Sequence, residues 1–74
     1  MTAKEVLGFS RVGDVEAVRD LLNLGDVKRE FFNLRFIRHM SLQQISQNMS
    51  VSYSYASIAR ISAEVNAMLE ELDL

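Results

Sequence analysis

The stretch SLQQISQNMSVSYSYASIARIS, residues 41–62, combines hydroxyl, amide and tyrosine side chains with a single cation, Arg60. Side chains of these types form hydrogen bonds to base edges and to phosphate oxygens of DNA. Its serines have no histidine or carboxylate beside them in the pattern of a catalytic triad, and no glycine-rich loop precedes a helix. The stretch therefore indicates binding rather than catalysis, and we expect no enzymatic activity.

His39 is the only histidine in the chain. It has no second ligand at a spacing typical of metal sites, and a cation near the C-terminal end of a helix is favoured by the helix dipole. The chain has no cysteine, which excludes disulfides and thiolate metal sites. We expect neither a metal nor another cofactor.

The opening stretch has the pattern of a helix-turn-helix motif. Ser41 and Gln44 have the spacing of a capping box, which predicts the start of a short helix there. A helix-turn-helix also needs apolar residues that lock its helices, a small residue where they cross, and a tight turn. Most of these requirements are met by Ile45, Ser46, Met49, Ser50 and Val51.

The segment LRFIRHMSLQQISQNMSVSYSYAS resembles region 4, the promoter-reading region of sigma-70-type bacterial sigma factors, over about residues 29–72. The resemblance implies that the second helix of the motif enters the major groove, and that the domain also docks on the flap of the RNA polymerase β subunit. By position, it implies that bases or phosphates face Ser52, Tyr53, Ser54, Tyr55, Ser57 and Arg60, with Arg35, Arg38 and Gln43 near the DNA backbone. More weakly, ASIARIS resembles the recognition helix of Trp-repressor-like proteins.

The second half of the motif departs from the sigma pattern. Ala56 stands where an apolar anchor is expected, whereas Ile58 and Ile61 lie on another side of the helical wheel. Either the turn is about two residues longer than usual, or the helix presents a small-residue face as a second contact surface. That face would consist of Ala56, Ala59, Ala63 and Ala67.

Charge is distributed unevenly along the chain, whose net charge is −2. Cations cluster just before the motif, at Lys28, Arg29, Arg35, Arg38 and His39. They could reach phosphates beside the turn, or form a solvated face that pairs with Asp26 and Glu30. The tail must stay off a DNA duplex because it carries Glu64, Glu70, Glu71 and Asp73.

The remaining patterns predict a single all-α domain, residues 1–74, of about five helices, with the helix-turn-helix at about 41–72. A Thr2–Glu5 capping box begins a helix over about 3–11 that Gly13 stops. Asp14 is the predicted N-cap of a second helix, which covers about 15–24 and ends before Gly25 in the C′ position. Asp26 caps a third, which carries most of the aromatic residues and ends near His39. A short fourth helix and a long fifth complete the domain.

The last helix has an apolar seam at Ile58, Ile61, Val65, Met68 and Leu72, which extends back to Val51 if the helix starts early. This seam fits a two-stranded coiled coil between two chains, and it equally fits packing within one chain. Tyr53 and Tyr55, two positions apart, cannot both face the core, so at least one should be exposed to a partner.

Composition places the chain among globular proteins, with 49% apolar and 24% charged residues. No window approaches the roughly 20 apolar residues that span a bilayer, so we expect a cytoplasmic protein. Together the patterns predict a small bacterial or phage transcription regulator whose last helix binds DNA, with affinity that falls steeply with salt. The alternative is a protein-binding module of the same fold that engages RNA polymerase, a sigma factor or another partner, or that forms a dimeric adaptor.

Overall fold

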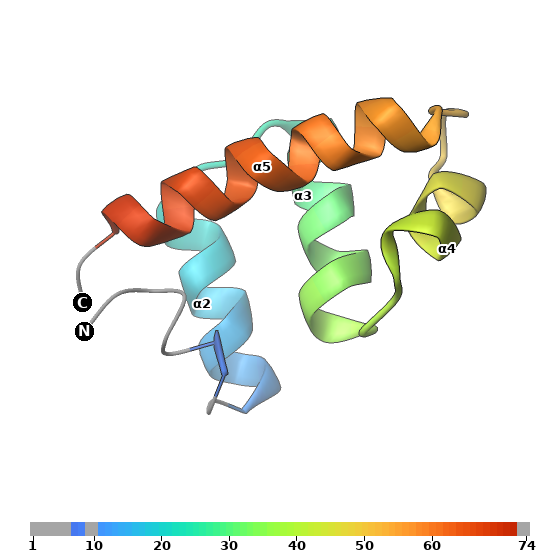
Figure 1. The fold of residues 1–74 in the computed structure, drawn as a ribbon. Helices are drawn as coiled ribbons and strands as arrows, with labels where there is room; N and C mark the ends of the chain where they lie inside the picture. Colours follow the sequence, from blue (N-terminus) through green and yellow to red (C-terminus); the bar gives the residue numbers. More distant parts are fainter. Residues whose placement is uncertain (1–6, 9–10, 73–74) are drawn as a thin grey trace.

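The computed structural model of the chain describes residues 7–8 and 11–72, and its regular structure there is entirely helical (Figure 1). Helix α2 spans Val12–Leu22, and α3, Asp26–Phe32, continues into the π-helical turn η1, Asn33–Ile37. Helix α4 spans Leu42–Asn48, and α5 spans Tyr55–Glu71. The long α5 lies across α2 and α3, with α4 beside its first turns (Figure 1).

The all-α class is confirmed for the described residues, as is the long C-terminal helix. Taking α3 and η1 as one helix, this part of the chain shows four helices against the five predicted. The helix predicted over residues 3–11, with its Thr2–Glu5 capping box, lies largely outside the described residues.

The core is a single apolar cluster to which α2, α3, α4 and α5 all contribute. Its members are at most 5% exposed: Val15, Val18, Phe31, Phe32, Ile45, Ile58, Val65 and Leu69. The third predicted helix does supply the large aromatic residues. Val27, in the first turn of α3, is 38% exposed.

Helix α2 begins earlier than predicted, at Val12 rather than Val15. The residue before the helix is Arg11, whose carbonyl accepts hydrogen bonds from the amides of Asp14 and Val15, at 3.0 and 3.1 Å. Gly13 therefore lies within the first helical turn instead of stopping a helix, and Asp14 is not the cap. Its acidic side chain still suits this position because the N-terminal end of a helix dipole is positive.

Helix α2 also ends differently, because Asn23 and not Gly25 has the left-handed backbone conformation, with φ of 51°. Asparagine adopts this conformation more readily than most residues, so the chain can turn there without glycine. Gly25 has φ of −70° and is the N-cap of α3, whereas Asp26, the predicted cap, is the first residue of that helix. Both predictions were wrong by one or two residues.

The third helix does not run unbroken to His39. After Phe32 it widens into η1, where the Arg38 amide donates to the Asn33 carbonyl at 3.1 Å across five residues. The rings of Phe32 and Phe36 still pack together, with centroids 4.8 Å apart. The helix ends near His39, as predicted: η1 ends at Ile37, Arg38 is its C-cap, and His39 follows with φ of 55°.

Candidate DNA-binding surface

Helix α4 starts where the capping box predicted. The Ser41 amide donates to Gln44 Oε1 at 2.9 Å, and the Gln44 amide donates to Ser41 Oγ at 3.2 Å. These reciprocal bonds satisfy amides that a helix start leaves without partners. The first helix of the motif is thus fixed by local sequence.

The turn between α4 and α5 consists of residues 49–54, since α4 ends at Asn48 and α5 begins at Tyr55. A typical helix-turn-helix turn has about three or four residues. The first of our two interpretations, a turn about two residues longer than usual, therefore describes this chain. Ser54 closes the turn as the N-cap of α5, because its Oγ accepts the Ser57 amide at 3.2 Å.

The longer turn brings Ile58 rather than Ala56 into the position of the apolar anchor. Ile58 and Ile45 are both 0% exposed and belong to the same core, which locks α5 against α4. Of the predicted small-residue face, Ala56, Ala63 and Ala67 are exposed and Ala59 is half-buried. A small-residue surface therefore exists as well, and the two interpretations are compatible.

The residues predicted to contact DNA lie mostly at the surface. Tyr55 is 56% exposed, whereas Tyr53 is half-buried and packs against the core, as two tyrosines so spaced require. Ser57 is also half-buried. The other predicted contact residues are all exposed: Ser52, Ser54, Arg60, Arg35, Arg38 and Gln43.

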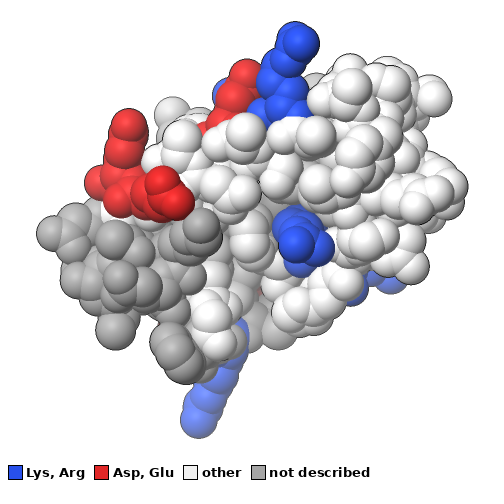
Figure 2. Space-filling view, viewed as in Figure 1, with Lys and Arg blue, Asp and Glu red and all other residues white. Residues whose placement is uncertain are grey.

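The surface of the motif is nearly free of charge. Residues 41–59 contain no Lys, Arg, Asp or Glu; they comprise all of α4 with its N-cap, the turn and the first residues of α5. Figure 2 shows this as an uncharged area over α4 and the beginning of α5, with acidic side chains gathered near the other end of α5. The acidic end of α5, which includes Glu70 and Glu71, thus lies away from the turn.

The cations before the motif do not form the pairs with Asp26 and Glu30 that one of the two alternatives required. Lys28 binds Glu64 of α5 with Nζ 3.2 Å from the carboxylate, and Arg29 lies 3.6 Å from Asp20 of α2. Neither pairs with Asp26 or Glu30, because each cation has its partner on a neighbouring helix, Glu64 on α5 and Asp20 on α2. Lys28 and Arg29, two of the five predicted cations, therefore form ion pairs within the domain.

Arg35, Arg38 and His39 remain exposed at the other end of this helix. Arg35 donates from Nη1 to the Met40 carbonyl at 2.8 Å, which fixes its side chain beside the start of α4. These residues, together with Arg60, are the cations available near the motif.

Comparison with protein-family models, curated proteins and solved structures gives no match for this chain. The resemblance to sigma region 4 therefore rests on the residues of the motif alone.

Sequence reasoning missed a long-range contact that holds the turn. The carboxylate of Glu30, on α3, accepts a hydrogen bond from the Ser50 amide at 3.0 Å and a second from the Ser50 hydroxyl. Twenty residues separate the two positions. No local pattern signals such a contact.

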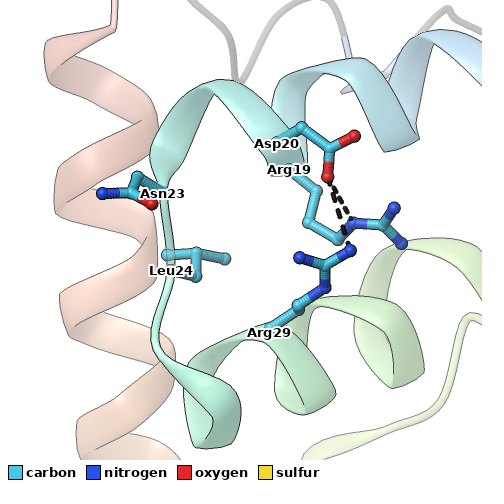
Figure 3. A pocket seen from close by; sticks show the side chains of 5 residues that line it. All are labelled: Arg19, Asp20, Asn23, Leu24 and Arg29. Carbon is cyan, nitrogen blue, oxygen red and sulfur yellow. Dashed lines mark hydrogen bonds and ion pairs between the residues drawn. The ribbon is translucent and has the colours of Figure 1, made fainter.

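A polar pocket of about 360 Å³ lies between the end of α2 and the start of α3 (Figure 3). Two arginines converge on one carboxylate oxygen there: Arg19 Nε lies 3.2 Å and Arg29 Nη2 3.6 Å from Asp20 Oδ1. Arg19 also donates to Asn33 Oδ1 at 2.8 Å. Two arginines side by side could bind an anionic ligand, but here the Asp20 carboxylate already lies between them. The cluster therefore links α2 to α3 and η1.

The seam of α5 is used within the chain. Ile58 and Val65 are 0% exposed, so they cannot also form a coiled-coil interface with a second chain in this structure. Ile61 and Leu72 are half-buried against the same core. Met68 is also half-buried. Val51 lies in the turn, 59% exposed, and does not extend the seam because the helix begins four residues later.

Within the described residues, no group of three or more His, Asp or Glu side chains is arranged to hold a metal ion. In the same part of the chain, no helix has both the length and the apolar character to cross a membrane.

Proposed function

We propose that the chain is a small transcription regulator that binds DNA by placing the start of α5 in the major groove. The observation that carries this proposal is the packing of α4 against α5 through Ile45 and Ile58, which leaves the capped start of α5 at the surface. Recognition helices of helix-turn-helix proteins contact base edges with the residues at their N-terminal end.

The exposed side chains at this end suit base recognition. The hydroxyl of Ser52 and the phenol of Tyr55 can each donate and accept hydrogen bonds, and the ring of Tyr55 offers an apolar surface to a thymine methyl group. Arg60, one to two turns farther along α5, supplies a phosphate contact. Arg35 and Arg38 supply further phosphate contacts, and the Gln43 amide lies at the start of α4.

The number of cations sets the expected salt dependence. Each neutralised phosphate contributes about −0.9 to the slope of log affinity against log salt concentration. Contacts from Arg35, Arg38 and Arg60 would therefore give a slope of about −2.7. Between about 50 and 200 mM salt the affinity should fall roughly fortyfold.

The test is selection of duplexes from a random-sequence DNA pool by the purified protein, followed by fluorescence anisotropy at several salt concentrations. A complex with the selected duplex and the stated slope would support the proposal. If the protein binds no duplex at low ionic strength, the proposal is wrong.

The uncharged surface of residues 41–59 favours a second function, a protein-binding module that engages RNA polymerase, a sigma factor or another transcription protein. The exposed Val51 and Tyr55 would be its apolar contacts. Two substitutions separate the functions, because Arg60→Ala removes a phosphate contact while Val51→Asp places a charge in an apolar contact. Loss of partner capture with Val51→Asp but not with Arg60→Ala, using purified RNA polymerase as the probe, would favour the second function.

A further inference from the structure

The contact between Glu30 and Ser50 joins α3 to the turn of the helix-turn-helix. One carboxylate oxygen, Oε1, accepts the Ser50 amide at 3.0 Å, and Oε2 accepts the Ser50 hydroxyl. Ser50 is the second residue of the turn, two residues before Ser52 and five before Tyr55. The contact therefore acts at the point where the chain leaves α4 and heads for the proposed DNA-reading surface.

Apolar packing against the core holds the turn at Met49 and at Tyr53, but not at the exposed Ser50 between them. Glu30 and Ser50 line a surface hollow of about 170 Å³ together with Asp26, Val27 and Val51. Val27 is 38% and Val51 59% exposed, so both valines leave a large part of their surface open to solvent. The hydrogen bonds are the specific connection across it, and bonds to an ionised carboxylate are stronger than those between neutral groups.

We propose that Glu30 is the positioning residue of the turn, which fixes the path of residues 50–54 and so the presentation of Ser52 and Tyr55. This inference rests on the proposed function, because its consequence is for sequence discrimination in DNA binding. Contacts to base edges need a fixed geometry, whereas phosphate contacts through flexible arginine side chains tolerate movement.

Positioning and simple electrostatics predict opposite results at Glu30. A carboxylate close to a DNA-binding surface repels phosphates, so its removal alone would raise the affinity for any duplex. Loss of positioning would instead lower the affinity for the selected duplex and leave affinity for mixed-sequence duplex equal or higher. The ratio of the two affinities therefore reports on positioning.

The experiment compares Glu30→Ala, Glu30→Gln and Ser50→Ala on the selected duplex and on a mixed-sequence duplex. The glutamine keeps an oxygen acceptor and adds an amide donor for Ser50, but it lacks the charge. We expect Glu30→Ala to lower the affinity ratio about tenfold, Ser50→Ala to lower it about threefold because the amide bond remains, and Glu30→Gln to preserve most of it. Equal ratios for Glu30→Ala and Glu30→Gln would overturn the proposal.

A second measurement, on the protein without DNA, tests whether Glu30 fixes the turn independently of whether the protein binds DNA. Amide hydrogen exchange at Ser50 and NMR relaxation of residues 49–54 should increase in Glu30→Ala and stay near wild type in Glu30→Gln, with circular dichroism confirming that each variant is folded. If the wild type binds no duplex, the proposed function fails, while these data still decide whether Glu30 fixes the turn. Unchanged exchange and relaxation in folded Glu30→Ala would overturn the inference.

Discussion

Lys28 of α3 and Glu64 of α5 form an ion pair, with Nζ 3.2 Å from the carboxylate. Glu64 lies four residues after Arg60, the spacing at which opposite charges pair along a helix. The carboxylate turns instead to α3, and no ion pair of Arg60 is seen among the described residues. The guanidinium of Arg60 is thus exposed and available to a phosphate.

The Lys28–Glu64 pair should contribute little to stability, since the two side chains are 37% and 48% exposed. We expect a double-mutant cycle of Lys28→Ala and Glu64→Ala, measured by urea unfolding, to give a coupling free energy of about 0.2–1 kcal/mol. The coupling should shrink in high salt because mobile ions screen exposed charges. A coupling above about 2 kcal/mol that salt does not change would contradict this.

Arg60→Ala should weaken DNA binding and reduce the magnitude of the salt slope by about one, the contribution of one phosphate contact. The measurement is anisotropy of a labelled duplex across a salt series. Arg11→Ala is the matched control, because Arg11 is an exposed arginine that precedes α2, away from the motif. An equal change in slope for both variants would indicate non-specific attraction rather than a contact by Arg60.

Ser54→Ala should destabilise the protein by about 1 kcal/mol because α5 loses its N-cap, and Ser54→Gly should cost only a few tenths. Both variants lack the hydroxyl, so a direct contact of Ser54 with DNA would weaken binding equally in the two. We expect urea unfolding to separate them and DNA affinity under folded conditions to stay near wild type, because Ser54 Oγ is already bonded to Ser57. A large loss of affinity in Ser54→Gly would assign this hydroxyl to the DNA.

Ile58→Ala should lower the free energy of unfolding by about 2–5 kcal/mol, because Ile58 is 0% exposed and its truncation leaves a cavity. Val51→Ala, at a position that is 59% exposed, is the control and should change stability by less than about 0.5 kcal/mol. Denaturant unfolding measures both. Similar effects at the two positions would mean that the turn has the usual, shorter length and that Val51 takes part in the core.

Local signals in the sequence predicted the parts of the motif that depend on neighbouring residues. The Ser41–Gln44 capping box placed the start of α4, and the spacing of Ile58 and Val65 identified residues that α5 buries. The start of α5 was harder to predict, because Ser50, Ser52 and Ser54 are all suitable caps. The choice of Ser54 follows from burying Ile58, a tertiary effect.

Other features have no local signature. The contact of Glu30 with Ser50 spans 20 residues, and the pairing of Lys28 with Glu64 depends on how α3 packs against α5. The π-helical turn η1 lies in a segment whose composition suits an ordinary α-helix. At Asn23 and Gly25 the sequence offered two residues able to end α2, and glycine was the wrong choice because the helix ends before reaching it.

The absence of charge in residues 41–59 also bears on the kinetics of recognition. Charged surfaces steer partners during diffusion and can raise association rates well above the roughly 10⁵–10⁶ M⁻¹s⁻¹ of neutral ones. The surface of residues 41–59 has uncharged side chains on the turn and the first residues of α5, so it gives little such steering. Differences in affinity between partners will therefore come from the dissociation rate of the complex rather than from its association rate.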